Sequence, residues 1–206
     1  MKISSKLIFS LLFSVLLSSC GGGGSSSSGA GGTEGDSTVL KLVTIGDSNG
    51  TGAGYGRGWP DFVRDSLNVE VINDSEFGRP TRGGLDVIRS LINQHQPTHI
   101  LILLGTNDAT KGGNAPSAIA NLQAMADIAT NNNVVAVIGT VIPTSRSSVF
   151  NQIVTDINVG IRGISNATIA EVRAAVGDGF QFLADDVHLS TEGQRVVARA
   201  FVDAVE

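Results

Sequence analysis

Continuous apolar runs recur along the chain, separated by stretches in which apolar and polar residues alternate at helical spacing. Four runs stand out, and they predict strands over residues 39–45, 69–72, 100–104 and 134–138. A weaker candidate covers residues 167–172. Runs of this length bounded by turn residues are typical of strands that are buried on both faces of a parallel sheet.

The segments between these runs have the periodicity of helices. We expect helices over residues 59–67, 81–93, 116–130, 150–164 and 191–205. In the second, Leu85, Ile88, Leu91 and Ile92 share one face. Strands that alternate with helices predict right-handed crossovers. The fold class is therefore α/β, a three-layer α/β/α domain around a five-stranded parallel sheet, with sites beyond the carboxyl ends of the strands.

The first residues have the features of a targeting segment. Lys2 and Lys6 precede an apolar run over residues 7–17, whose length of about eleven residues is too short to span a bilayer. The sequence Leu17-Ser18-Ser19-Cys20 resembles a bacterial lipobox, in which cleavage precedes a cysteine that becomes lipidated. An ordinary secretory signal is the alternative. The lipobox is favoured because Cys20 is the single cysteine of the chain, which also excludes an internal disulfide.

Residues 1–19 are therefore expected to be a lipoprotein signal peptide, and residues 20–38 a lipidated cysteine with a flexible Gly/Ser linker. About 18 such residues have an r.m.s. reach of roughly 21–25 Å. Residues 39–206 have the length of one domain. The residue after the cysteine is Gly21 and not the aspartate that is associated with retention in the inner membrane. We therefore expect a lipid-anchored cell-envelope protein, on the outer membrane of a Gram-negative source, facing the periplasm or the exterior.

Composition and glycine spacing argue against several other classes. The net charge of −5 and the pI near 5.1 do not fit a nucleic-acid footprint of clustered Lys and Arg. Glycines in residues 50–58 alternate one by one, which is not the dinucleotide-binding spacing, and no P-loop occurs. The histidines are dispersed, which argues against a metal site. We expect neither a cofactor nor a bound metal.

Ser48 is a candidate nucleophile, because it lies in Gly46-Asp47-Ser48 directly after the first expected strand. The alternative is a helix N-cap, a role that serine often takes. A serine hydroxyl needs a base to remove its proton. Of the three histidines, His95 lies at a helix exit and His99 at the amino end of the third expected strand. His188, in a late loop, is the candidate base.

The partners of this pair come from other motifs. Asp185, three residues before His188, can accept a hydrogen bond from Nδ1 of the imidazole, and Asp186 is its less well placed competitor. Acyl transfer also needs donors for a tetrahedral oxyanion. Candidates are the Asn107 carboxamide and the backbone N–H groups of Gly78 and Ser48, although such residues are also ordinary turn formers.

These motifs together resemble the SGNH/GDSL hydrolase family, in its small bacterial thioesterase/lysophospholipase and arylesterase-like branch. The matching blocks are Gly46-Asp47-Ser48, residues 73–78 with Gly83-Gly84-Leu85, Gly105-Thr106-Asn107-Asp108, and residues 185–190. The resemblance implies an SGNH/flavodoxin-like fold and a cofactor-independent serine esterase for small-molecule or lipid esters. It assigns Ser48, His188 and Asp185 to catalysis, and Ser48, Gly78 and Asn107 to the oxyanion hole.

The second block departs from the family pattern. Gly78 is surrounded by Glu76-Phe77 and Arg79-Pro80, at positions where small polar residues are commoner in the family. In the first block, Asn49 stands where the family name has leucine. We therefore expect the geometry near Gly78 and the acyl pocket to differ most from relatives. Two alternative functions stay open: a carbohydrate O-acetylesterase, and a non-catalytic surface lipoprotein that binds glycan or lipid.

Overall fold

The computed structural model describes residues 39–206, so the expected signal peptide, Cys20 and linker lie outside the described residues. Five parallel strands form one sheet in the order β2-β1-β3-β4-β5. The strands are β1 (Lys41–Gly46), β2 (Glu70–Ser75), β3 (His99–Leu103), β4 (Val135–Gly139) and β5 (Thr168–Ala170). No helix within residues 39–206 combines the length and the apolarity that a membrane span requires.

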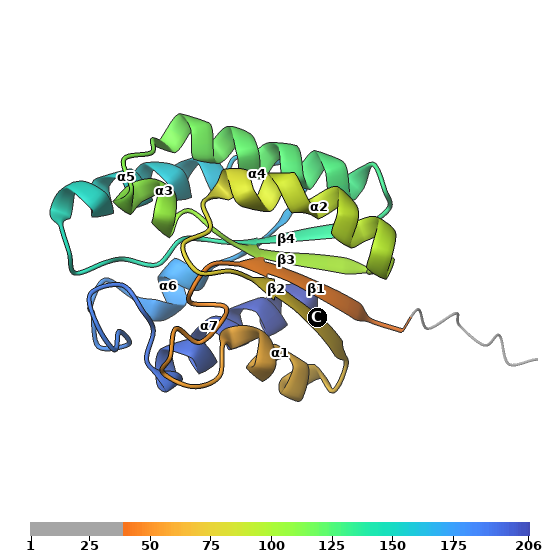
Figure 1. The fold of residues 1–206 in the computed structure, drawn as a ribbon, viewed down its shortest axis with the longest axis horizontal. Coiled ribbons are helices and arrows are strands. Elements are labelled where there is room, and N and C mark those ends of the chain that lie inside the picture. The colour runs from red at the N-terminus through yellow and green to blue at the C-terminus, as the bar shows by residue number, and fades with distance from the viewer. Residues whose placement is uncertain (1–38) are drawn as a thin grey trace, which may run out of the picture. The chain divides into compact units, whose positions relative to one another are not determined.

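Helices cover both faces of the sheet (Figure 1). One face carries α1 (Trp59–Leu67), α6 (Val172–Val176) and α7 (Thr191–Val205). The other carries α2 (Thr81–His95), α3 (Thr106–Thr110), α4 (Ala115–Thr130) and α5 (Ser148–Ile161). The expected three-layer α/β/α fold with five parallel strands is confirmed.

The continuous apolar runs are explained by two separate cores. Successive side chains of β3 alternate between them: Ile100 and Ile102 pack under α2, α4 and α5, whereas Leu101 and Leu103 pack on the α1–α7 side. A strand buried on both faces must be apolar at every position. In the second core, the ring of Trp59 stacks on Phe201 with centroids 4.4 Å apart.

Some elements differ from the expected ones. The fifth strand is only three residues long, because Glu171 leaves the extended conformation and the chain enters α6 at Val172. Two five-residue helices, α3 and α6, were not predicted, since such short helices show no periodicity. The edge strand β2 continues beyond residue 72 to Ser75, because its polar end still pairs with β1.

Candidate active site

Ser48 lies in a tight turn at the carboxyl end of β1. The backbone N–H groups of Gly50 and Thr51 both donate to the carbonyl of Asp47, at 3.1 and 3.3 Å, and fold the chain back on itself. The next helix, α1, begins only at Trp59. Ser48 is therefore not a helix N-cap, and the alternative interpretation of this serine is wrong.

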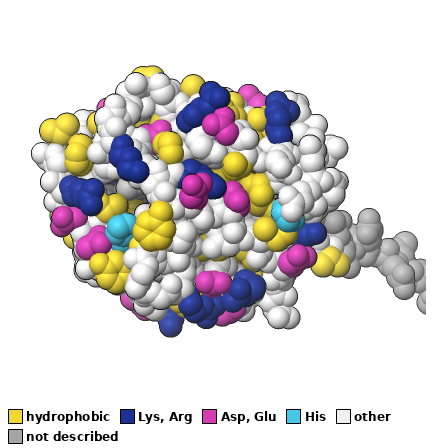
Figure 2. All heavy atoms as spheres, viewed as in Figure 1, with side chains coloured by type: hydrophobic (Ala, Val, Ile, Leu, Met, Phe, Trp, Pro, Cys, Tyr) yellow, Lys and Arg dark blue, Asp and Glu magenta, His cyan; other side chains and the backbone are white. Residues whose placement is uncertain are grey.

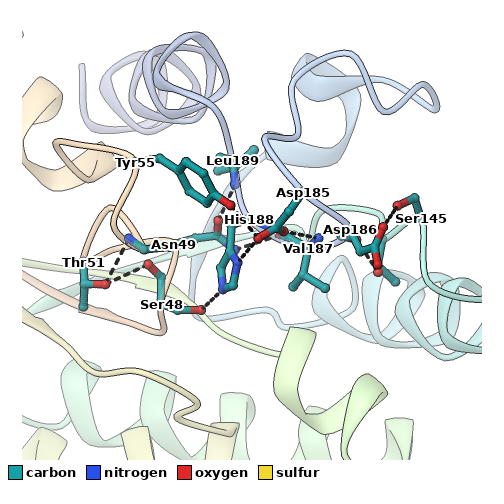
Figure 3. Close-up of polar contacts among 12 residues, drawn as sticks. Ser48, Asn49, Thr51, Tyr55, Ser145, Asp185, Asp186, Val187, His188 and Leu189 are labelled. Atoms are coloured by element: carbon teal, nitrogen blue, oxygen red, sulfur yellow. Dashed lines mark hydrogen bonds and ion pairs between the residues drawn. The ribbon is translucent and has the colours of Figure 1, made fainter.

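The structure brings Ser48, His188 and Asp185 into one hydrogen-bonded chain (Figure 3). The Ser48 Oγ is 3.0 Å from Nε2 of His188, and Nδ1 of the same ring is 2.8 Å from Oδ2 of Asp185. Residues 140 positions apart thus meet because the β1 turn and the loop before α7 lie at the same edge of the sheet. The geometry is that of a nucleophile, a base and an orienting acid.

Asp185 accepts more hydrogen bonds than the one from the imidazole. Its Oδ1 accepts from the backbone N–H groups of Val187 and His188, at 2.8 and 2.7 Å. Its Oδ2 also accepts from the hydroxyl of Tyr55, at 3.1 Å. Burial alone would raise the pKa of Asp185, but these hydrogen bonds outweigh it and hold the pKa well below its usual range. The carboxylate is therefore ionised at neutral pH.

Asp186, the competing acid, turns away from the imidazole (Figure 3). Its Oδ1 lies 3.0 Å from the hydroxyl of Ser145, and its carbonyl accepts from the Thr144 hydroxyl at 2.7 Å. Asp186 therefore holds the β4–α5 loop rather than His188. Of the two neighbouring carboxylates, the structure places only Asp185 against the base.

The two other histidines lie outside this site. His95 is the last residue of α2, and His99 opens β3 at the amino end of the strand. The Nδ1 of His99 is 3.0 Å from the Thr98 hydroxyl, and burial lowers the pKa of this histidine. Neither residue contacts Ser48, so within the described residues only His188 is placed to act as its base.

Two backbone N–H groups at the site are free to donate. Within residues 39–206, the N–H groups of Ser48 and Gly78 donate to no protein acceptor. Gly78 has a φ of +74°, in the left-handed region that favours glycine. Its carbonyl accepts from Nζ of Lys111 at 3.0 Å, which helps to hold this conformation. Both groups therefore fit the expected role of oxyanion donors.

Asn107 is already engaged in this structure. Its Nδ2 donates to Oδ2 of Asp47 and to the carbonyl of Arg79, both at 3.2 Å. The neighbouring Asp108 accepts from the backbone and the hydroxyl of Thr81, at 2.9 and 2.6 Å, and so ties α3 to the start of α2. To donate to an oxyanion as well, the Nδ2 group of Asn107 has to share one of these two hydrogen bonds with it.

The unusual charges around Gly78 form a compact network. The buried guanidinium of Arg79 bonds to the backbone and the carboxylate of Asp74, the latter at 2.7 Å, and to Glu76 at 3.0 Å. Pro80 stands in an extended conformation directly before α2. The departures from the family pattern therefore brace the loop, and Gly78 still lines the cavity beside Ser48.

Asp47 lies beneath the site with 3% of its surface exposed. Burial raises the pKa of Asp47 to about 6, although hydrogen bonds from the Asn49 backbone and Asn107 and the nearby His188 act to lower it. Its side chain supports Asn107, as described above. The sequence offers no signal for this role, because the contact between Asp47 and Asn107 joins positions 60 residues apart.

Asn49 makes a connection that sequence reasoning missed. Its Oδ1 accepts from the backbone N–H of Leu189 at 2.8 Å, and its Nδ2 donates to the carbonyl of Val187 at 3.4 Å. These residues flank His188 on both sides (Figure 3). The asparagine is 2% exposed. Asn49 thus fixes the base-bearing loop to the turn that carries Ser48.

A cavity of about 200 Å³ opens over these groups, with Ser48, Gly78, Asn107 and His188 in its lining. Exposed aromatic rings of Phe77 and Tyr55 lie near it, each with its centroid 6.4 Å from that of His188. A larger hollow of about 410 Å³ lies against β5 and α7. The lining of that hollow contains neither a serine nor a histidine. The smaller cavity is therefore the candidate active site, because it contains the nucleophile and the base.

Comparison with known proteins shows the family of the chain. Residues 44–196, more than half of the chain, match the GDSL-like lipase/acylhydrolase family. The chain belongs to this family. The matched region contains all five residues that the sequence suggests for catalysis and the oxyanion hole, from Ser48 to His188.

Two similar proteins match part of the chain. An arylesterase from Vibrio mimicus is 37% identical over 94 residues, which cover 41% of this chain and 46% of that protein. A thioesterase 1/protease 1/lysophospholipase L1 from Escherichia coli K12 is 35% identical over 77 residues, which cover 34% and 36%. The matches thus span less than half the length of these curated relatives.

Solved structures share the fold over most of the described chain. The crystal structure of TesA superposes with a TM-score of 0.72 at 19% identity, covering 81% of this chain and 98% of that one. A member of the lipolytic protein G-D-S-L family from Veillonella parvula gives a TM-score of 0.72 at 22% identity, covering 80% and 97%. At these identities the likeness supports the fold.

Proposed function

We propose that this protein is a serine esterase that hydrolyses acyl esters through an acyl-enzyme intermediate. The observation that carries the proposal is the hydrogen-bonded chain from Ser48 Oγ through His188 to Asp185, with distances of 3.0 and 2.8 Å. The chain's membership of a lipase/acylhydrolase family supports the same chemistry.

In the first half of the reaction, the Ser48 Oγ attacks the ester carbonyl carbon while Nε2 of His188 takes the hydroxyl proton. Asp185 stabilises the imidazolium that forms. The carbonyl oxygen becomes an oxyanion, which accepts hydrogen bonds from the free backbone N–H groups of Ser48 and Gly78 and from the side-chain amide of Asn107. Collapse of this intermediate expels the alcohol, which takes the proton from His188.

In the second half, the acyl group stays bound to Ser48 as an ester. His188, neutral again, accepts a proton from a water molecule as that water attacks the acyl carbonyl. The same donors stabilise the second oxyanion. Its collapse releases the carboxylic acid and returns the proton to the Ser48 Oγ, so no cofactor is consumed.

The size of the cavity favours short acyl groups. About 200 Å³ is less than the roughly 300–1,000 Å³ of pockets that enclose drug-sized ligands. A short chain such as acetyl fits this volume better than a long fatty acyl chain. This observation favours carbohydrate O-deacetylation as a second candidate, in which the sugar would lie outside the cavity against the exposed ring of Phe77.

The test is a panel of p-nitrophenyl esters from acetate to palmitate, with purified wild type beside Ser48→Ala. We expect turnover that falls with acyl length, labelling of the wild type by a fluorophosphonate, and neither for the variant. Thr51→Ala is a matched control, because Thr51 bonds to the Ser48 carbonyl through its own hydroxyl and takes no part in the proton transfers.

An unlabelled and inactive wild type would refute the proposal. It would favour the non-catalytic alternative, in which the same fold binds glycan or lipid. Activity that rises toward palmitate would be consistent with an esterase but would refute the preference for short acyl groups.

We also propose that the domain is anchored to the membrane of the cell envelope through a lipid on Cys20. The support is the lipobox-like sequence and the Gly/Ser-rich segment that follows it. Cells given radiolabelled palmitate should incorporate label into the wild type and not into Cys20→Ser. Equal labelling of both proteins would contradict the anchor.

A further inference from the structure

Most basic side chains in residues 39–206 are paired with a carboxylate. Every Lys and Arg there forms an ion pair except Arg89, Lys111 and Arg146. On the face drawn in Figure 2, positive and negative side chains are interspersed. An unpaired cation is therefore an exception in this protein, and its position carries information.

Two of the three exceptions line the cavity that contains Ser48 and His188. Lys111 directly follows α3, and Arg146 lies in the loop between β4 and α5, so two separate elements bring positive charge to one place. The chain as a whole has a net charge of −5. The pairing of cations elsewhere and their convergence here point to a negative charge that the protein itself does not supply.

The carboxylates near the site are engaged with other groups. Asp185 is bonded to His188 and Tyr55, and Asp186 to Ser145. Asp108 is bonded to Thr81. None of the three lies within ion-pair distance of Lys111 or Arg146. The two cations are thus free to meet an incoming anion.

We propose that Lys111 and Arg146 bind an anionic group, a carboxylate or a phosphate, on the ester substrate. This inference rests on the proposed esterase function and narrows its substrate class. The planar guanidinium of Arg146 can take such a group with two parallel hydrogen bonds. The ammonium of Lys111 uses one donor for the Gly78 carbonyl and keeps two for the substrate.

The anion therefore lies next to the scissile ester. Because Lys111 also holds Gly78, an anion bound there is placed beside one of the proposed oxyanion donors. Exposed charge pairs are weakened by salt, so the preference for anionic substrates should fall as ionic strength rises.

The experiment compares matched pairs of acetyl esters. One pair is para-acetoxybenzoate and its neutral methyl ester, which tests a carboxylate. The other is acetylated glycerol phosphate and acetylated glycerol, which tests a phosphate. The readout is the ratio of kcat/KM for the anionic ester to that for its neutral partner, measured for wild type, Arg146→Gln and Arg146→Glu.

We expect Arg146→Gln to lower this ratio by roughly two- to fivefold, as for the loss of one exposed charge pair, and Arg146→Glu to lower it further. Arg89→Gln is the matched control, because Arg89 is also exposed and unpaired but lies on α2 away from the cavity. Its ratio should equal that of the wild type. The pair with the larger wild-type ratio identifies the anion.

For the wild type alone, raising NaCl from 50 to 500 mM should lower the ratio, which tests the inference without any variant. Ratios that are insensitive both to Arg146 substitution and to salt would overturn the anion site while neutral esters are still hydrolysed. If no ester is hydrolysed and Ser48 is not labelled, the proposed function itself fails, so the two failures are distinguishable.

Discussion

Replacing Asn49 tests whether the position of the base depends on a residue outside the catalytic chain. The side chain joins the turn of Ser48 to the backbone on both sides of His188. Asn49→Leu keeps a similar volume in this buried position and removes both hydrogen bonds. The N–H of Leu189 and the carbonyl of Val187 then lose their protein partner.

The expected cost follows from these two backbone groups. A buried polar group left without a partner costs about 1–3 kcal/mol. The bond to Val187 is long, at 3.4 Å, so its loss counts for less. We expect a total loss of about 2–4 kcal/mol, which lowers Tm by roughly 4–16 °C in a domain of this size. This is less than the whole stability of a typical domain, so the variant stays folded at 25 °C.

The effect on activity should exceed the effect on folding. Releasing the His188 loop lengthens the contact between Nε2 and the Ser48 hydroxyl, and a shift of about 1 Å costs roughly 100-fold in rate. We expect kcat for p-nitrophenyl acetate to fall by about this factor with little change in KM. The assay pairs steady-state kinetics at 25 °C with thermal unfolding followed by circular dichroism.

Asn158→Leu is the matched control. Asn158 is also buried, and it makes the same pair of bonds, to the backbone N–H and carbonyl of Val141 at 2.7 and 3.0 Å. It should lower Tm by a similar amount and kcat far less. If both variants lose kcat in proportion to their loss of stability, Asn49 does not position His188 and the reasoning is refuted.

Three further predictions concern the acid, the glycine donor and the buried carboxyl. Asp185→Asn should lower kcat by about 10⁴ and Asp186→Asn by less than about tenfold, and the opposite ranking in steady-state kinetics would reassign the acid. Gly78→Ala, at a φ of +74°, should lower kcat by about 10²–10³ because it displaces an oxyanion donor. The control Gly112→Ala, at a φ of +80° with open space around it, should leave kcat unchanged. Because the pKa of Asp47 rises from 3.8 to about 6 on folding, its contribution to stability is complete below pH 3.8 and is lost as the pH rises through 6. Asp47→Asn should remove this pH dependence, which is worth about 3 kcal/mol in the free energy of unfolding, as measured by urea denaturation between pH 3.5 and 7. If the free energy of unfolding changes with pH in the variant as it does in the wild type, the raised pKa of Asp47 is contradicted.

The layers of the fold were predictable because both faces of the sheet are buried. That burial makes the strand positions continuously apolar, and β1, β3 and β4 were found within two residues at either end. The polar end of β2 was not predictable in the same way. Its residues Asn73 to Ser75 join the sheet by backbone pairing with β1, which a hydrophobic pattern does not record.

The candidate site also contains residues that a local sequence pattern reveals and residues that it does not. Ser48 was found in the sequence because it lies in a short motif after the first strand, and Asp185 and His188 because they are three residues apart in another. The structure brings the two motifs together across 140 positions of the chain. Asn49 and Tyr55 were missed. Their contacts with the His188 loop join positions more than 100 residues apart, and no local pattern encodes such a pairing.

The loop around Gly78 shows why the departures from the family pattern have to be considered as a set. Arg79 is buried, and a buried guanidinium without partners is strongly destabilising. Asp74 and Glu76 supply those partners. The carbonyl of Arg79 in turn accepts from Asn107, so the charges that brace the loop also hold a proposed oxyanion donor. Substituting one of these charges alone leaves another uncompensated, and we therefore expect their effects on the oxyanion hole to be coupled and not additive.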